Sequence, residues 1–571
     1  LKHGIKSLDT IDDNGRYTKH IKKFEGTHIF KADQIVIDKL KEYKKLLSNG
    51  KLTHSYPHSW RSKAPLVHRA TSQWFISMEE KDLRKKALKA IDDTAFYPER
   101  GRDRIRSMIE TRPDWCISRQ RIWGVPLPLF VSKKTNEPLK DKDIIENIAN
   151  IFEKEGADCW FTDDPQKFLG KKYKKEDFIK SSDIVEVWFD SGATHSYVLE
   201  KRKDLTWPAS MYLEGSDQHR GWFHSSLLES CGTRGKAPFK SILTHGFVVD
   251  GKGLKMSKST GNIIAPEDVL KKYGADILRT WVTASDYAED LRLDYSILEQ
   301  HAESYRKIRN TFRFLLGNLN DKKNNFDLNS KEVEKWPELE RYILHQIFTL
   351  NKSFEKYFKE YNFHKLYKEL INFCSLDLSA FYFDIRKDIL YCDGLKSEKR
   401  KICINLLSLI LDILLKWFAP ILSFTTEEIF QIVNPEKKSS IHLESFPKIP
   451  SNWEDKKLSE KWEKLKIIRS VVNTGIEVKR SNKDIGSSLE ANIEIYLNKE
   501  YLELIKDINL SEYFITSKAS AKHMIDDKKI FKLDDVPNIG VYVEKAKGEK
   551  CSRCWKILGN LCERCSNVLK N

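Results

Sequence analysis

The chain has 571 residues, too many for a single hydrophobic core, so we expect about three to four domains. Its 99 basic and 83 acidic residues give a net charge of +16, which favours a polyanionic partner such as nucleic acid. A general enrichment in Lys, Asn and Ile would also raise the charge. The sequence offers no secretion signal and no clean apolar run of about 20 residues, so neither a secreted nor a membrane protein is expected.

The first 290 residues divide into two patterns. Residues 1–70 are mixed, with a helical spacing of apolar residues over 32–47. From residue 71, short apolar strands alternate with helical segments, which predicts an α/β region with a parallel sheet. The expected strands are DIVEVWFD, SMYLEG and SILTHGFVVD, followed by the helical segment EDVLKKYGADILRTWVTAS.

The rest of the chain begins with purely helical spacing. Residues 406–422 form an apolar block interrupted by Asp412 and Lys416, which predicts a buried helix. Residues 434–452 are rich in Pro and Ser and predict a linker. After it come a basic helix, an alternating strand at 491–497 and further alternation near 540–544.

The stretch GLKMSKSTGN, residues 253–262, places two lysines three residues apart on a glycine-flanked loop. The loop follows a predicted strand and precedes a helix that starts at Pro266 and ends at Gly274. Open α/β sheets bind ligands at the carboxyl ends of their strands. Lys255 and Lys258 are therefore suited to charge that develops on a phosphoryl group, whereas a solvated basic loop is the alternative interpretation.

Several further segments occur in a characteristic order: HSYPHSWR, ATSQWF, RPDWCISRQRIWGVPLP, VWFDSG, YLEGSDQHRGWF and LTHGFVVDGKGLKMSKSTGN. With the C-terminal cysteines, they resemble the class I aminoacyl-tRNA synthetases, and most closely the bacterial isoleucyl-tRNA synthetases, over essentially the whole chain. The resemblance implies a multidomain α/β plus all-α protein. It implies a returning end of the editing insertion (1–70), the second half of a Rossmann-like catalytic domain (71–295), a helical anticodon-binding domain (296–435), a small α+β junction domain (453–545) and a zinc-binding module (546–571).

The resemblance also assigns roles to residues. Lys258 would contact ATP and stabilise the reacting phosphate with help from Lys255, and Glu214 would bind the aminoacyl-adenylate. Gln218, His219 and Trp222 would be further substrate contacts, with structural packing as an equal alternative. The implied protein is a cytoplasmic, monomeric ligase that uses ATP, Mg²⁺, isoleucine and tRNA(Ile).

Part of the family pattern is missing from the sequence. It contains neither the His-Ile-Gly-His-type phosphate-binding signature nor the threonine-rich text of the editing pocket. We therefore expect a partial enzyme that is inactive by itself. Two alternatives stay open: a valyl-tRNA synthetase-like ligase, and a non-catalytic tRNA-binding remnant.

The last 21 residues hold two Cys-x-x-Cys pairs. Four thiolates at about 2.3 Å form a closed tetrahedral site, which predicts one structural Zn²⁺; free redox pairs without metal are the alternative. The basic residues between the cysteines are expected to touch an RNA backbone. The ligands are Cys551, Cys554, Cys562 and Cys565, and the basic residues are Arg553, Lys556 and Arg564.

The helical region offers one candidate RNA-facing stripe. Arg306, Arg309 and Arg313 are spaced by three and four residues and so share one helix face. They are expected to face tRNA phosphates, although a solvated surface would look the same.

Overall fold

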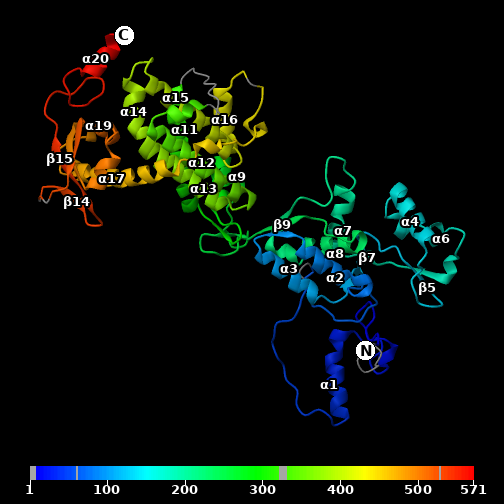
Figure 1. The fold of residues 1–571 in the computed structure, drawn as a ribbon. Helices are drawn as coiled ribbons and strands as arrows, with labels where there is room; N and C mark the ends of the chain where they lie inside the picture. The colour runs from blue at the N-terminus through cyan, green and yellow to red at the C-terminus, as the bar shows by residue number, and fades with distance from the viewer. Residues whose placement is uncertain are drawn as a thin grey trace. The chain divides into compact units, whose positions relative to one another are not determined.

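The computed structural model describes residues 8–59, 62–319, 331–436, 438–525, 527 and 529–570. Residues 1–7 of the expected first domain lie outside this range. The chain forms two compact units, Leu1–Leu243 and Thr244–Asn571, and each is described by itself (Figure 1).

The first unit begins with loops and one helix. The expected helix at 32–47 is confirmed over α1 (Ala32–Glu42), which stops before Lys44 adopts a left-handed backbone with φ 53°. The described part of residues 8–74 also contains two short 3₁₀ helices, η1 (Lys19–Ile21) and η2 (Ile29–Lys31), and is otherwise held by isolated β-bridges and turns.

A three-stranded sheet forms the centre of the first unit. Its order is β2 (Ala95–Tyr97), β9 (Ser241–His245) and β8 (Tyr212–Gly215), and β2 runs parallel to β9. Three helices pack around it: α2 (Leu83–Asp92), α3 (Arg100–Glu110) and α8 (Trp222–Arg234) (Figure 1). The parallel α/β arrangement expected from the sequence is confirmed here.

The expected strand at 183–190 is largely wrong. Only β7 (Ile184–Val185) is extended, and residues from Val187 form helix α7 (Val187–Gly192), which packs on α8. The segment fits both periods, because Val185, Phe189 and Gly192 also have the three-to-four spacing of a helix face. Packing of Phe189 on Trp115, with ring centroids 5.6 Å apart, favours the helix.

A small α+β body is inserted between β4 (Ser118–Arg119) and β7. It contains the antiparallel pair β5 (Phe130–Ser132) and β6 (Phe178–Lys180), and the helices α4 (Lys142–Glu155), α5 (Cys159–Thr162) and α6 (Pro165–Leu169). Trp160 and Phe168 are fully buried in its own core. The sequence did not indicate this separate body.

The second unit opens with the elements that carry the lysine loop. Strand β10 (Val248–Asp250) pairs in parallel with β11 (Leu291–Leu293). Helix α9 (Pro266–Tyr273) begins at Pro266 and ends at Gly274, which has φ 84°, as the sequence predicts. Helix α10 (Ala275–Ala284) follows, and its Trp281 lies in a core with Val269.

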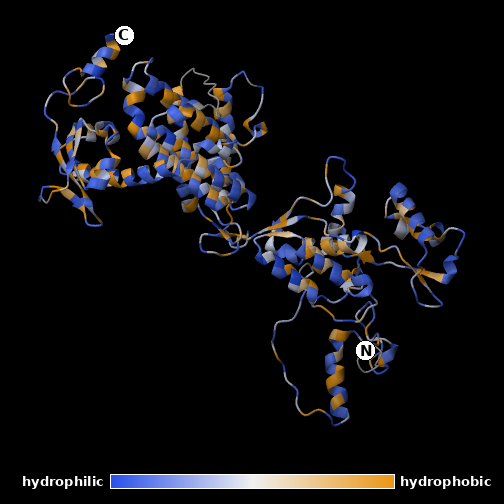
Figure 2. Ribbon diagram, viewed as in Figure 1, coloured by the Kyte–Doolittle hydropathy of each residue, from blue (hydrophilic) through white to orange (hydrophobic). Residues whose placement is uncertain are grey.

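A bundle of long helices follows, as predicted. It contains α11 (Tyr295–Leu319), α12 (Glu338–Lys359), α13 (Phe363–Asn372), α14 (Phe383–Cys392), α15 (Glu398–Phe418) and α16 (Ser423–Val433). Figure 2 shows apolar and polar residues alternating along these helices. The apolar block at 406–422 is buried within α15 and the turn after it. None of the described helices is long and apolar enough to cross a membrane.

The C-terminal part packs a helix against a sheet. Helix α17 (Lys456–Ser481) lies on a four-stranded sheet of order β13 (Lys518–His523), β12 (Ala491–Leu497), β15 (Val536–Lys545) and β14 (Phe531–Leu533). The predicted strand at 491–497 is confirmed with the same bounds. The sheet and the helical bundle share one hydrophobic core. The short helices α18 (Lys499–Leu504) and α19 (Leu510–Tyr513) precede β13, and α20 (Glu563–Lys570) is the last helix of the described residues.

Candidate functional site

The loop that carries Lys255 and Lys258 is closed at its base by two polar side chains. The amide of Asn262 donates to Asp250 Oδ2 at 3.0 Å and to the carbonyl of Lys255 at 3.2 Å. The other carboxylate oxygen of Asp250 accepts the backbone N–H of Leu254 at 2.8 Å. These bonds, led by that from Asn262, lower the pKa of the Asp250 carboxyl. The sequence analysis assigned no role to Asp250 or Asn262, although Asn262 is the last residue of the stretch 253–262 and Asp250 lies three residues before the stretch begins.

The hydroxyl groups of the loop serve its own structure. Ser257 Oγ lies 2.7 Å from Thr260 Oγ1, and Thr260 Oγ1 donates to Asn262 Oδ1 at 2.6 Å. Lys255 and Lys258 are both exposed, and neither ammonium forms an ion pair with any residue that the structure describes. The loop therefore presents two free cations from a backbone that is internally fixed.

The first unit holds the predicted carboxylate. Glu214 lies in β8 and is exposed. Next to it, Gln218 Oε1 accepts the backbone N–H of Trp222 at 2.9 Å and so satisfies a free donor at the start of α8. Gly221 is required there, because an added Cβ would lie 2.6 Å from that oxygen. Gln218 thus has a structural role in the turn between β8 and α8.

His219 and Trp222 are packed side chains. His219 is only 1% exposed, its Nδ1 lies 2.8 Å from the carbonyl of Ser216, and burial lowers its pKa. Trp222 stacks on Tyr212 with ring centroids 4.1 Å apart, and its indole N–H donates to the carbonyl of Ser191 at 3.0 Å. For His219, burial favours the packing alternative over substrate contact.

The predicted catalytic residues therefore form two groups. Lys255 and Lys258 share one loop of the second unit, and Glu214, Gln218, His219 and Trp222 share the β8–α8 connection of the first. The structure thus offers an exposed basic loop in the second unit and an exposed carboxylate near a strand end in the first, and each can contact a charged ligand.

Comparison with known proteins supplies the family. Residues 16–294 match the family model of tRNA synthetases class I (I, L, M and V), and residues 340–497 match the anticodon-binding domain of tRNA ligase. The chain is 66% identical over 567 residues to the isoleucine–tRNA ligase of Pelagibacter ubique (strain HTCC1062), covering 99% of this chain and 61% of the relative. The chain belongs to the class I tRNA synthetases.

Two further relatives carry the same name. The isoleucine–tRNA ligase of Mesorhizobium japonicum is 47% identical over 96% of this chain and 54% of its own length. That of Syntrophotalea carbinolica is 45% identical over 100% of this chain and 63% of its own length. The synthetase chain thus spans about three fifths of the length of the curated relatives it matches.

At its C-terminus the synthetase chain brings four thiols together. The sulfurs of Cys551, Cys554, Cys562 and Cys565 all lie within 4.8 Å of one another and are buried. Cys554 Sγ and Cys562 Sγ are 3.7 Å apart. Four thiolates around one Zn²⁺ at about 2.3 Å would stand about 3.8 Å apart along the tetrahedral edges, so the cluster could hold a metal ion.

The basic residues of this cysteine module, residues 551–565, each contact another part of the chain. Arg553 donates to the carbonyl of Cys392 at 2.5 Å, Lys556 is 8% exposed with its ammonium 3.3 Å from the carbonyl of Ser511, and Arg564 pairs with Asp388 at 2.6 Å. All three side chains are thus bonded within the chain, and their expected contact with RNA stays a prediction. The partners lie about 45 to 176 residues away, which local sequence cannot indicate.

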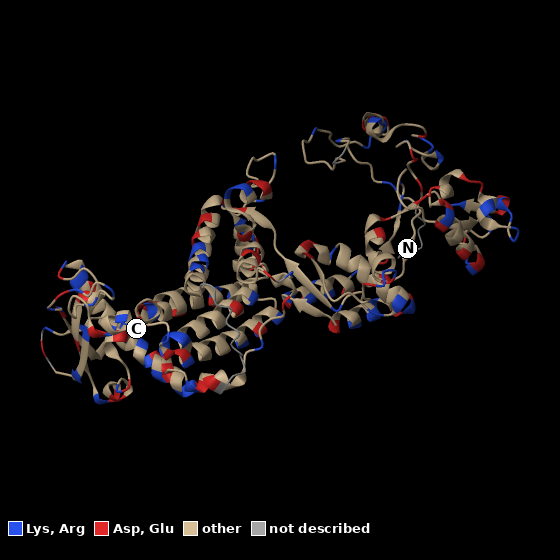
Figure 3. Ribbon diagram, turned by 90° about the horizontal axis from the view of Figure 1, so that it is seen from above, with Lys and Arg blue, Asp and Glu red and all other residues tan. Residues whose placement is uncertain are grey.

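The arginine stripe on α11 is exposed, as expected. Arg306 pairs with Glu303, Arg309 donates to the hydroxyl of Tyr305 at 2.9 Å, and Arg313 is also exposed. Figure 3 shows basic and acidic residues interspersed along the helices.

Sequence reasoning also missed a buried carboxyl group in the synthetase domain. Glu229 lies in α8 at 9% exposure, and its Oε1 has no hydrogen-bond partner among the described residues. Burial, and then the charge of Asp190 on α7, raises the pKa of Glu229 to about 9. A Cβ at Gly192 would come within 2.1 Å of this oxygen, so glycine is needed at that position. A single acidic residue in the segment WFHSSLLESCGTR is the only signal that the sequence carried.

Proposed function

We propose that this chain is the part of an isoleucine–tRNA ligase that carries the second half of the catalytic domain, the anticodon-binding region and a zinc module. With ATP and Mg²⁺, the complete ligase would convert isoleucine to isoleucyl-adenylate and transfer it to tRNA(Ile). The observation that carries this proposal is the 66% identity, over 99% of the chain, to a protein of that name. We propose the same domain limits as in the sequence analysis: 1–70, 71–295, 296–435, 453–545 and 546–571.

In this proposal the lysine loop acts on the triphosphate of ATP. Lys258 contacts the α-phosphate as its bond to the leaving pyrophosphate breaks, and Lys255 assists. Both cations are exposed and unpaired within the described chain, so they can meet new negative charge without first breaking an ion pair. The Asp250–Asn262 hydrogen bond supports this role. It joins the two ends of the loop and so limits how far the lysines can move before the loop closes over ATP.

The amino acid would be held by the first unit. Glu214 is proposed to receive the ammonium group of the aminoacyl-adenylate through a charge-assisted hydrogen bond. Its exposure at the end of β8 supports this role. Gln218 and Trp222 would line the site and also fix the turn into α8. The buried His219 would pack behind them without contacting the substrate.

The remaining assignments concern RNA and metal. Arg306, Arg309 and Arg313 are proposed to face tRNA phosphates, and one Zn²⁺ is proposed for the four cysteines. The exposure of the three arginines on α11 and the short distances between the four sulfurs support these assignments. A monomeric, cytoplasmic protein completes the proposal.

The experiment is ATP–pyrophosphate exchange with isoleucine and with valine. It compares the 571-residue chain alone with the same chain joined to the preceding segment of the Pelagibacter ubique relative. We expect isoleucine-dependent exchange only in the joined protein. Preference for valine would favour a valine ligase. Binding of tRNA without any exchange in either protein would leave a tRNA-binding role and contradict the ligase.

A further inference from the structure

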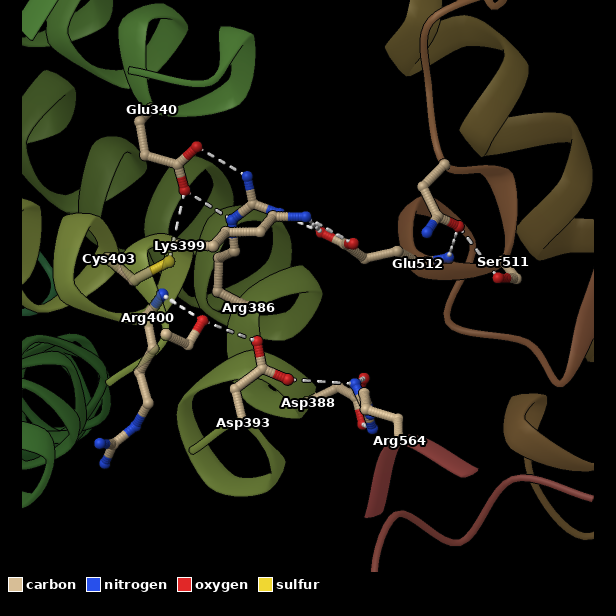
Figure 4. Close-up of polar contacts among 12 residues, drawn as sticks. Glu340, Arg386, Asp388, Asp393, Lys399, Arg400, Cys403, Ser511, Glu512 and Arg564 are labelled. Carbon is tan, nitrogen blue, oxygen red and sulfur yellow. Dashed lines mark hydrogen bonds and ion pairs between the residues drawn. The ribbon is translucent and has the colours of Figure 1, made fainter. Parts of the chain in front are cut away.

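Each cysteine pair of the module encloses an arginine, and both arginines reach the same helix end. Arg564, between Cys562 and Cys565, donates from both terminal nitrogens to Asp388, at 2.6 and 2.8 Å, and its Nη1 lies 3.5 Å from Asp393 (Figure 4). Arg553, between Cys551 and Cys554, donates to the carbonyl of Cys392 at 2.5 Å. Cys392 is the last residue of α14.

The chemistry of a helix terminus explains this meeting. The last carbonyls of an α-helix lack partners within the helix and carry the negative end of its dipole, so cations are stabilised there. Arg553 satisfies one such carbonyl, and Asp388, one turn earlier, offers a carboxylate to the planar guanidinium of Arg564. The side chain of Asp388 is only 17% exposed, so solvent screens the pair weakly.

The positions of the two arginines depend on the positions of the thiols, because each arginine is the neighbour of a cysteine in the sequence. Arg553 immediately precedes Cys554 and Arg564 immediately precedes Cys565. Seven residues separate the two pairs, so an ion held by all four sulfurs sets how far apart the two guanidinium groups stand. Cys392 packs directly among the four cysteines, which brings the end of α14 against the cluster.

We propose that Asp388 links metal binding to the docking of the cysteine module on the helical bundle. The metal holds Arg553 and Arg564 at the spacing that fits the end of α14, and Asp388, by fixing Arg564, raises the affinity of the four thiolates for the metal. Because linkage is reciprocal, each event strengthens the other by the same factor. Asp388 is a positioning residue in this scheme and not a ligand.

The cysteine module has a second set of contacts, independent of Asp388, that would keep it in place when Asp388 is changed. The backbone N–H of Ile557 donates to Ser517 Oγ at 2.7 Å, and the Lys556 ammonium lies 3.3 Å from the carbonyl of Ser511. These contacts attach the middle of the module to the sheet domain. A variant at position 388 should therefore alter the affinity for metal without releasing the module.

The test is competition for Zn²⁺ between the full chain and a chromophoric chelator. We expect Asp388→Asn and Arg564→Gln each to raise the dissociation constant for Zn²⁺ by about tenfold. The double variant should be no weaker than either single variant, because both remove one shared interaction. Asp412→Asn is the matched control. Asp412 is 50% exposed and pairs with Lys416 of the same helix α15, so the variant should stay within about twofold of the unmodified chain.

A second measurement keeps the proposal open to refutation if the variants are less stable. Amide hydrogen exchange at Asp393, whose N–H donates to the carbonyl of Ile389, should speed up when Zn²⁺ is removed from the unmodified chain. It should change little on removal from Asp388→Asn, where the link is already broken. An unchanged Zn²⁺ affinity in Asp388→Asn, additive effects in the double variant, or absence of Zn²⁺ binding by the unmodified chain would each overturn the proposal.

Discussion

Asn262 donates its side-chain amide to Asp250 at 3.0 Å and so joins the two ends of the loop that carries Lys255 and Lys258. Within this loop Gly253 has a left-handed φ of 81°. We therefore predict that Asn262→Ala lowers the rate of adenylate formation by about tenfold in the joined protein, because the lysines lose a fixed base. Pyrophosphate exchange at saturating ATP measures this.

The control for Asn262 is Asn318, whose amide donates to the carbonyl of Phe314 on α11, far along the chain from the loop. Asn318→Ala should leave the exchange rate within about twofold. Equal losses in both variants would mean that Asn262 acts through general stability alone.

The buried carboxyl group of Glu229 predicts a pH dependence. Its pKa is raised to about 9, with Asp190 and Glu186 facing it and Arg234 on its own helix. The unfolded state releases this proton near pH 4.3, whereas the folded state keeps it, so stability falls as pH rises from about 4 to 9. Glu229→Gln should remove that slope and stabilise α8 by about 1 kcal/mol or more at pH 8.

Amide exchange of α8 at pH 5 and pH 8, corrected for intrinsic rates, checks the prediction. Glu153→Gln, on the exposed face of α4, is the control and should keep the slope of the unmodified chain. A slope that persists in Glu229→Gln would assign the effect to another group.

Arg386 predicts a large effect on stability. Its guanidinium is 4% exposed and holds Glu340 of α12 at 2.6 and 2.7 Å, while also pairing with Glu512 of α19 (Figure 4). Arg386→Met would leave Glu340 buried without its cation, at a cost of about 3–5 kcal/mol. Chemical denaturation of the second unit measures this.

Arg480 gives the matched comparison for Arg386. It pairs with Glu477 on the exposed face of α17, so Arg480→Met should cost less than about 1 kcal/mol. Similar losses in the two variants would show that burial does not decide the strength of these pairs.

The cysteine module predicts one bound Zn²⁺ per chain. Cys565→Ser removes one of four sulfurs and should abolish stoichiometric Zn²⁺ at equimolar chelator, whereas Cys116→Ser, outside the cluster, should retain it. Elemental analysis of the purified variants decides this. Retention of a full equivalent of Zn²⁺ in Cys565→Ser would contradict the four-cysteine site.

The sequence predicted those helices and strands whose local residue pattern fits only one type of secondary structure. The strand β12 alternates buried and partly buried residues from Ala491 to Ile495, so its period of two is visible in the sequence. The start of helix α9 is predicted by Pro266 and its end by Gly274. In both cases the residues themselves fix the backbone.

Prediction failed where a distant partner decides the outcome. The segment at 183–190 fits a strand or a helix, and packing on α8 selected the helix. Arg564 is a surface cation by composition, yet Asp388, 176 residues earlier, makes it an interface residue. The raised pKa of Glu229 likewise depends on its burial and then on the approach of Asp190, and neither can be seen in the sequence of α8.

The most direct test of the account compares two lysines of one loop. Lys258→Ala and Lys252→Ala are made in the joined protein, and isoleucine-dependent pyrophosphate exchange and tRNA binding are measured for each. We predict that Lys258→Ala lowers exchange by about 100-fold and leaves tRNA affinity within about twofold, while Lys252→Ala changes neither. Unchanged exchange in Lys258→Ala, or loss of tRNA affinity in its place, would contradict the role of the lysine loop.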